Sequence, residues 1–220
     1  MRRAALLASL SLVVAACGSE DATPVAACPT NAPTTVEAQA ILEDAALATV
    51  TVSGAVSGEF SMELYGDQAP IATANFVSLA RCGFYDGIWF HRVLAGFVIQ
   101  AGDPGTKTQD DDFPGLGAGG AGYEFEIEPP ANGLDYSQYS VSMANDTRTN
   151  DSQFFVALTD LRGRLTPTFT IFGQVTGGTD IIDAIAAVPV NDPSVGVPLT
   201  AVTIDSIVIS AGSGPAPSGD

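Results

Sequence analysis

The sequence predicts a mainly β domain, built as a closed antiparallel barrel that is capped by two α-helices. Two observations lead to this prediction. Many short segments carry the apolar patterns of β-strands, and only two segments in the same region carry the periodicity or the cap residues of a helix. Many short strands with few helices are typical of a sheet that closes on itself.

The N-terminal part of the domain predicts a pair of strands. These strands are expected over residues 48–52 and 59–65. In the second strand, Phe60, Met62 and Leu64 alternate with polar residues, which indicates that one face is buried and the other is exposed.

Two segments favour helices. The first helix is predicted to begin within residues 67–70, with Pro70 in its first turn, and to stop at Gly83. The second is predicted over residues 179–187, with Thr179 or Asp180 as its N-cap. The apolar face of the first helix is formed by Ala72, Phe76, Leu79 and Ala80.

The remaining strands lie between the two helices and after the second. A last strand is expected over residues 202–209, where the apolar pattern shifts phase near Asp205 and Ser206 and indicates a β-bulge. The others are expected over residues 89–93, 97–100, 141–143, 154–157 and 168–175.

The barrel domain is predicted to span residues 48–211, a length typical of a single domain. Residues 17–47 are predicted to form a flexible tether, because Ala, Pro, Thr and Ser dominate its first half. Within it, residues 36–46 have enough helix formers for a short helix. Residues 212–220 are rich in Gly, Ser and Pro and predict a disordered tail.

Residues 1–16 have the features of a secretory signal peptide, since two arginines precede an apolar run that is too short to span a bilayer. The ending Val14–Cys17 resembles a bacterial lipobox, which implies cleavage before Cys17 and attachment of lipid to it. An ordinary signal peptide with an incidental cysteine is the alternative. A lipid anchor would place the protein in the extracytoplasmic cell envelope. Gly18 favours the periplasmic side of the outer membrane if the cell is Gram-negative.

The chain carries 25 acidic and 8 basic residues, for a net charge of −17. This charge argues against nucleic acid or an anionic membrane surface as an electrostatic partner. After export, Cys28 and Cys82 would either form a disulfide or remain one surface and one buried thiol. The sequence has one histidine, His91, and no C-x-x-C pair, so no metal site and no cofactor are expected.

Two motifs carry the functional signal. Phe90–Asp103 places an arginine and a glutamine among apolar neighbours, and Ser142–Asn145 is followed by Ser152–Phe155. In this order and at this spacing, they resemble the two signatures of the cyclophilins, which are peptidyl-prolyl cis–trans isomerases. The resemblance implies an eight-stranded antiparallel barrel that isomerises X-Pro bonds in proline-containing polypeptides.

The resemblance also implies roles for individual residues. Arg92 matches the catalytic arginine, and Gln100 matches the glutamine that binds the substrate backbone and holds the arginine. Ala144 and Asn145 match the segment whose backbone pairs with the substrate, and Gln153 matches a polar residue at its edge. The walls of the proline pocket are implied to be Phe97, Val98, Phe155, Leu165 and Phe169, the last at a position where many members carry His or Tyr.

An arginine beside an apolar pocket suits this reaction. Rotation about a peptide bond faces a barrier of about 18–20 kcal/mol. The twisted transition state loses amide resonance, and a permanently charged donor can stabilise it without a nucleophile, a base or a metal. His91 is therefore interpreted as structural. The competing hypothesis is a non-catalytic module that binds proline-containing segments.

Two other motifs are set aside. Gly117–Gly122 fits G-x-G-x-x-G, but it neither follows a predicted strand nor begins a helix, which argues against a dinucleotide site. Asp110–Asp112 offers oxygen atoms to Ca²⁺, yet without EF-hand spacing it is interpreted as a solvated acidic loop. A single domain on a tether is predicted to be a monomer.

Overall fold

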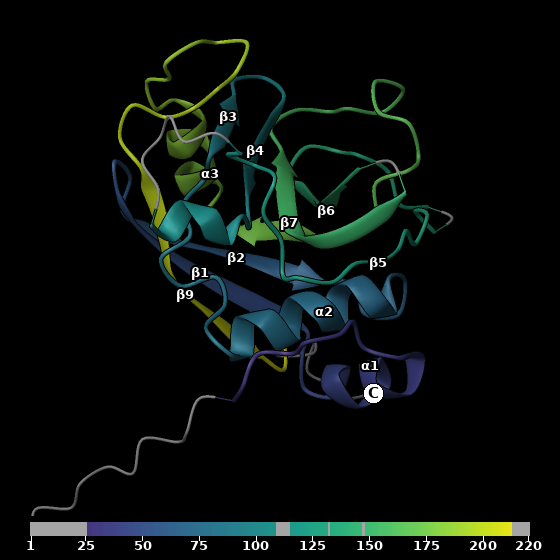
Figure 1. Cartoon of the computed structure of the whole chain (residues 1–220). Coiled ribbons are helices and arrows are strands. Elements are labelled where there is room, and N and C mark those ends of the chain that lie inside the picture. The colour runs from purple at the N-terminus through teal and green to yellow at the C-terminus, as the bar shows by residue number, and fades with distance from the viewer. Residues whose placement is uncertain (1–25, 109–114, 132, 147, 213–220) are drawn as a thin grey trace, which may run out of the picture.

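The computed structural model describes residues 26–108, 115–131, 133–146 and 148–212. The strands within them are β1 (Leu47–Gly54), β2 (Gly58–Leu64), β3 (Arg92–Leu94), β4 (Val98–Ala101), β5 (Phe125–Glu126), β6 (Ser140–Asn145), β7 (Thr149–Ala157), β8 (Ile171–Gly177) and β9 (Val202–Ser210). They form one antiparallel sheet in the order β3-β4-β7-β6-β8-β2-β1-β9, with β5 paired to β7. The sheet curls into a half-barrel, which confirms the predicted mainly β antiparallel class, with nine described strands where the resemblance implied eight (Figure 1).

The two outermost strands, β3 and β9, do not form a ladder with each other. The segment just before β3 bridges the gap instead, because the Gly87 amide donates to the Ile204 carbonyl at 2.8 Å and the Phe90 amide to the Val202 carbonyl at 3.0 Å. A single β-bridge joins Trp89 to β9. The predicted strand over residues 89–93 therefore divides into a bridging segment and a shorter β3.

Helix α2 (Pro70–Arg81) lies across one side of the sheet and buries the apolar face predicted for it (Figure 1). The Phe76 ring centroid lies 5.1 Å from that of Phe172 on β8 and 5.6 Å from that of Phe154 on β7. The second pair meets edge to face and the first is tilted, and such ring contacts add to the stabilisation from burying their area. The core therefore fixes β7, which also carries residues of the candidate site.

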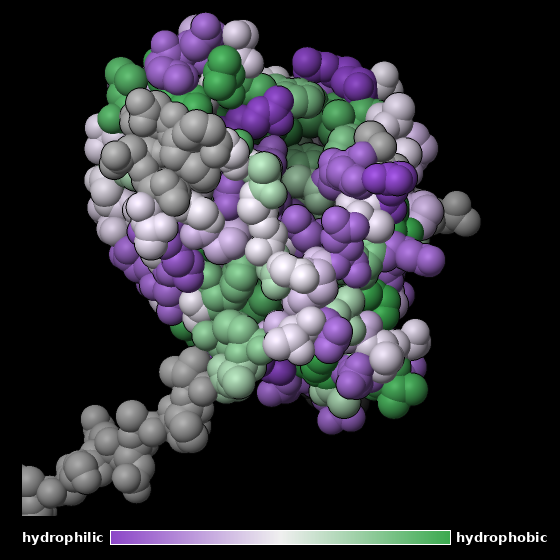
Figure 2. Space-filling model, viewed as in Figure 1, coloured by the Kyte–Doolittle hydropathy of each residue, from purple (hydrophilic) through white to green (hydrophobic). Residues whose placement is uncertain are grey.

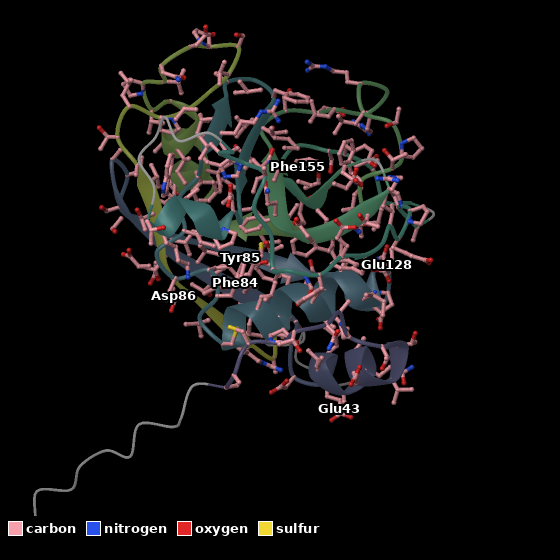
Figure 3. All side chains as sticks on the ribbon, in the orientation of Figure 1. Glu43, Phe84, Tyr85, Asp86, Glu128 and Phe155 are labelled. Carbon is pink, nitrogen blue, oxygen red and sulfur yellow. A yellow bond between two sulfur atoms is a disulfide. The ribbon has the colours of Figure 1, made fainter. Side chains whose placement is uncertain are left out.

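The N-terminus of α2 is capped by a residue far away in the sequence. Ala69, its N-cap, has no side chain that could accept a hydrogen bond. The Glu128 carboxylate accepts from the Ile71 and Ala72 amides at 3.0 and 2.8 Å, and Figure 3 shows Glu128 at this end of the helix. Burial raises the pKa of Glu128, and the two hydrogen bonds oppose that rise. The contact ties the segment after β5 to α2.

Two local predictions have different outcomes. The bulge in the last strand is confirmed, because Thr51 pairs with Ser206 while Val52 pairs with Ile204, which leaves Asp205 unpaired. The N-cap predicted for the second helix is wrong. Helix α3 (Thr179–Ala186) begins after Gly178, whose φ of 69° suits glycine, so neither Thr179 nor Asp180 occupies the cap.

A third helix, α1 (Thr35–Leu42), lies in the segment predicted to be a flexible tether. Thr34 and Glu37 form a capping box at its start, and Ala38 is fully buried. A disulfide joins Cys28 to Cys82, at the end of α2, so the paired alternative is the one observed. We call residues 26–46 with this disulfide the N-terminal clamp. The short helix predicted within residues 36–46 is present as α1, whereas residues 26–46 are held to the domain and are not the free tether predicted up to residue 47.

Several predictions fall outside the described residues. They concern the signal peptide over residues 1–16, the lipid on Cys17, the acidic segment Asp110–Asp112 and residues 213–220 of the predicted tail. Within the described ranges, no helix is both long and apolar enough to cross a membrane.

Candidate active site

Arg92 and Gln100 are cross-strand partners in the hairpin of β3 and β4. Gly96 lies in the turn with a φ of 71°, a conformation that glycine adopts without strain. Because residues directly opposite each other present their side chains on the same face, the two meet, and Arg92 Nη1 donates to Gln100 Oε1 at 3.3 Å. The hairpin register therefore creates the contact that the sequence motif implied.

The hydrogen bonds continue from Gln100 into the next layer. Gln100 Nε2 donates to Gln153 Oε1 at 2.8 Å, which orients the amide so that its oxygen faces the arginine. Gln153 is buried, and its Nε2 donates to the carbonyls of Gly117 and Gly119 at 2.8 and 2.7 Å. A chain of neutral groups thus holds Arg92 from one side. An arginine stays protonated at neutral pH, although burial lowers its pKa here.

A cavity of about 300 Å³ opens beside this chain, and we call it the proline pocket. Figure 2 shows hydrophobic atoms recessed between hydrophilic ones in the region where Figure 3 labels Phe155. The cavity is lined by Arg92, Phe97, Val98, Gln100, Ala144, Asn145, Phe155, Leu165 and Phe169. These are nine of the ten catalytic and substrate-binding residues predicted. Gln153, the tenth, lies behind Gln100 and lines the neighbouring cavity.

The aromatic wall of the pocket is held in place by a residue that the sequence did not reveal. The Phe155 and Phe169 rings meet edge to face at 5.5 Å. Tyr136 is buried beside them, and its hydroxyl donates to the carbonyls of Phe169 and Thr166 at 3.0 and 3.1 Å. Tyr136 stands in a stretch without strand or helix periodicity, so no pattern marked it. At the rim, the Arg164 guanidinium lies 5.8 Å from the centroid of the Phe97 ring.

His91 is buried to 4% exposure, and within the described residues neither ring nitrogen has a hydrogen-bond partner. Burial is the main reason that its pKa falls to about 4, and the Asp103 carboxylate opposes that fall. The imidazole is therefore neutral at pH 7. This placement fits the interpretation of His91 as a structural residue.

The Gly-rich segment packs against carboxylates instead of leaving space for a phosphate. Asp103 accepts from the Gly117 amide at 2.7 Å, and a Cβ atom on Gly119 or Gly120 would collide with the carboxylate of Asp103 or Asp151. The described residues after it enter β5 and not a helix, so the dinucleotide interpretation fails. In the part of the chain that the structure describes, no group of three or more His, Cys, Asp or Glu side chains could hold a metal ion.

The arrangement suits conformational catalysis. An apolar cavity can hold a proline ring, and the Arg92 donors at its rim can reach an amide attached to that ring. Gln100 preorganises the guanidinium, so little reorganisation is needed when the amide twists.

Comparison with known proteins gives the same picture. Residues 47–209 match the model of the family described as cyclophilin type peptidyl-prolyl cis-trans isomerase/CLD. A peptidyl-prolyl cis-trans isomerase of Helicobacter pylori is 40% identical over 131 residues, covering 58% of this chain and 74% of the relative. Peptidyl-prolyl cis-trans isomerase B of Streptomyces anulatus is 39% identical over 173 residues, covering 69% and 91%.

Solved structures agree with the sequence matches. A cyclophilin-type isomerase of Cryptosporidium parvum superposes with a TM-score of 0.65 at 29% identity, covering 78% of this chain and 99% of that one. The same protein was solved in the presence of the dipeptide Ala-Pro, with a TM-score of 0.64. This chain belongs to the cyclophilin-type peptidyl-prolyl cis–trans isomerase family.

Proposed function

We propose that this chain catalyses rotation about X-Pro bonds in exported proteins while it is anchored in the cell envelope by a lipid on Cys17. The isomerase activity is that of its family. The observation that carries the proposal is the Arg92 guanidinium, held by Gln100 at the rim of an apolar cavity large enough for a proline ring.

The residues of the pocket divide the reaction between binding and stabilisation. Phe97, Val98 and Phe155 bury the proline ring, which fixes one side of the amide while the other side rotates. Rotation removes amide resonance and leaves an electron pair on the prolyl nitrogen. Arg92 donates a hydrogen bond toward this nitrogen in the twisted state, where it is more basic than in either planar form. The bond is strongest at the top of the barrier, so it accelerates rotation in both directions.

Two observations support the exported context. Arg2 and Arg3 before an apolar run are typical of a signal peptide. The Cys28–Cys82 disulfide is of the kind that persists in oxidising compartments and is rare in the cytosol.

Lipidation of Cys17 is tested by mass spectrometry of the protein purified from its host membranes. Three acyl chains on an N-terminal cysteine support the anchor, whereas a soluble product cleaved elsewhere contradicts it.

The activity is tested with the full-length protein and a short peptide that contains one X-Pro bond. NMR exchange spectroscopy measures the cis–trans interconversion rate, and line broadening on the same sample reports binding. Uncatalysed interconversion takes tens of seconds or more. A faster interconversion in the presence of the protein supports the isomerase. Binding without acceleration would contradict it and favour the module that only holds proline-containing segments.

Sedimentation on the same sample tests the proposal that the chain is a monomer.

A further inference from the structure

A second cavity opens directly beside the proline pocket. Its volume is about 330 Å³, and it shares Gln100, Ala144 and Asn145 with the proline pocket, so the two form one continuous groove. We call it the acidic pocket. Its remaining walls are Gly117, Ala118, Glu124, Asp146, Thr149, Asp151 and Gln153. A polypeptide whose proline ring fills the first cavity can therefore place a neighbouring side chain in the second.

Three of the wall residues carry carboxylates, and their hydrogen-bond donors are mostly neutral. Thr149 donates from its hydroxyl to Glu124 at 2.7 Å and from its amide to Asp146 at 3.0 Å. The backbone amide of Gln153 donates to the Asp151 carboxylate at 2.8 Å. These bonds fix the positions of the carboxylates without neutralising their charge. The pocket therefore presents a preorganised negative surface to whatever enters it.

Little positive charge balances these carboxylates. Among the described residues, Arg148 is the one cation within ion-pair distance, at 3.5 Å from Asp146, and its side chain is 84% exposed. An ion pair that exposed is weak. Burial raises the pKa of Asp151, with the Glu124 and Asp103 carboxylates adding to the rise against the opposing backbone hydrogen bonds. Bringing a cation into the pocket would relieve this repulsion.

A bound metal ion is not the cation that the described side chains fit. Within the described ranges, no group of three or more His, Cys, Asp and Glu side chains could hold a metal ion. The carboxylates instead stand around a cavity of side-chain size that continues the proline pocket. The matching cation is therefore one carried by the polypeptide itself.

The spacing in an extended chain identifies which residue of the polypeptide would carry it. Successive side chains point to opposite sides, and side chains two positions apart lie on the same side, about 7 Å from each other. We propose that the acidic pocket selects substrates with lysine or arginine two positions from the proline. This inference rests on the proposed isomerase function and adds the substrate class that Glu124, Asp146 and Asp151 favour.

The test uses the full-length protein and two series of peptides. One series carries Lys, Gln or Glu two positions before the proline, and the other carries them two positions after it. We expect kcat/KM for Lys to exceed that for Glu by about tenfold in one series at low salt, because attraction in one peptide and repulsion in the other both contribute. The ratio should shrink at high salt, since screening weakens exposed charge pairs.

Matched variants locate the effect. Glu124→Gln and Asp151→Asn keep an acceptor oxygen for Thr149 and for Gln153 but remove the charge, so each should lower the Lys-to-Glu ratio. Comparing two peptides on the same variant cancels any general loss of activity. The control is Glu126→Gln, which removes the same charge from an exposed position on β5 outside the pocket lining, and it should leave the ratio unchanged.

The outcomes separate this inference from the proposed function. Equal rates for Lys and Glu in both series, with normal turnover of the Gln peptides, would overturn the selectivity and leave the isomerase intact. An equal fall of the Lys-to-Glu ratio in Glu126→Gln would also overturn the selectivity of the acidic pocket. The overall negative charge of the protein would then explain the preference for Lys. Absence of turnover with every peptide would refute the isomerase and with it the inference.

Discussion

The proline pocket and the N-terminal clamp lie on different sides of the barrel and are held by different bonds. Figure 3 shows Phe155 of the pocket and Glu43 at the end of α1 far apart in the view. The clamp is fixed by a disulfide and by the ion pair of Arg81 with Asp44 at 2.5 Å. The pocket is ordered by neutral hydrogen bonds around one arginine. From this difference we expect the clamp to contribute to stability and the pocket to contribute to activity, so that changes on the two sides have separate effects.

The largest expected effect is on the clamp side. Replacing both Cys28 and Cys82 by serine removes a cross-link between residues 54 positions apart. We expect the free energy of unfolding to fall by about 2–4 kcal/mol, because the unfolded chain regains the freedom that the cross-link removes. Denaturant unfolding measures the fall. The isomerisation rate of the folded variant should be unchanged, and a loss of turnover in the folded protein would break the comparison.

His91 sharpens the comparison, because it is adjacent to Arg92 yet is expected to act on stability. Its pKa is about 4 in the folded protein and about 6.5 in an unfolded chain. As the pH falls below the higher value, the unfolded chain binds a proton that the folded chain does not, so stability falls. We expect a loss of about 2 kcal/mol between pH 7 and pH 5 from this group alone.

The measurement compares the pH dependence of unfolding in wild type and in His91→Gln. The carboxyls of Asp151 and Glu128, whose pKa values are raised, shift stability in the opposite direction, but they are present in both proteins and cancel in the difference. A parallel pH dependence in the two proteins would show that the His91 pKa is close to its ordinary value.

A smaller effect is expected at the start of α1. Thr34→Ala removes the side-chain half of the capping box, in which Thr34 Oγ1 accepts from the Glu37 amide at 3.3 Å. An N-cap of this kind contributes about 1 kcal/mol, and less if the clamp frays without unfolding the barrel. Hydrogen exchange of the α1 amides measures it, with Thr30→Ala, an exposed residue of the clamp outside α1, as the control. Equal exchange in wild type and Thr34→Ala would refute the cap's contribution.

The sequence predicted two kinds of feature: elements with a regular local spacing, and the pocket residues that the two motifs implied through the family resemblance. Arg92 and Gln100 were assigned through the resemblance of Phe90–Asp103 to a family signature, and the hairpin register brings the two side chains together. The apolar face of α2 and the bulge at Asp205 were visible as periodicity and as a break in periodicity.

The missed parts depend on residues that meet only after folding. Glu128 caps a helix by accepting from an amide 57 positions earlier, and Tyr136 holds Phe169 from a stretch without periodicity. Strand β5 has two residues, too few to make a pattern. Predicting the Cys28–Cys82 disulfide would have required the distance between the two Cα atoms, which is 5.1 Å in the structure. The spacing of the two cysteines along the chain does not reveal that distance.

The central claim is that Arg92 stabilises the twisted amide and does little for the fold. The direct test measures cis–trans exchange of an X-Pro peptide and denaturant unfolding on the same samples of wild type and Arg92→Ala. A charged hydrogen bond contributes about 1.5–3 kcal/mol, so kcat/KM should fall by about ten- to a hundredfold or more. The free energy of unfolding should change little. An unchanged rate in a folded Arg92→Ala protein would contradict the account.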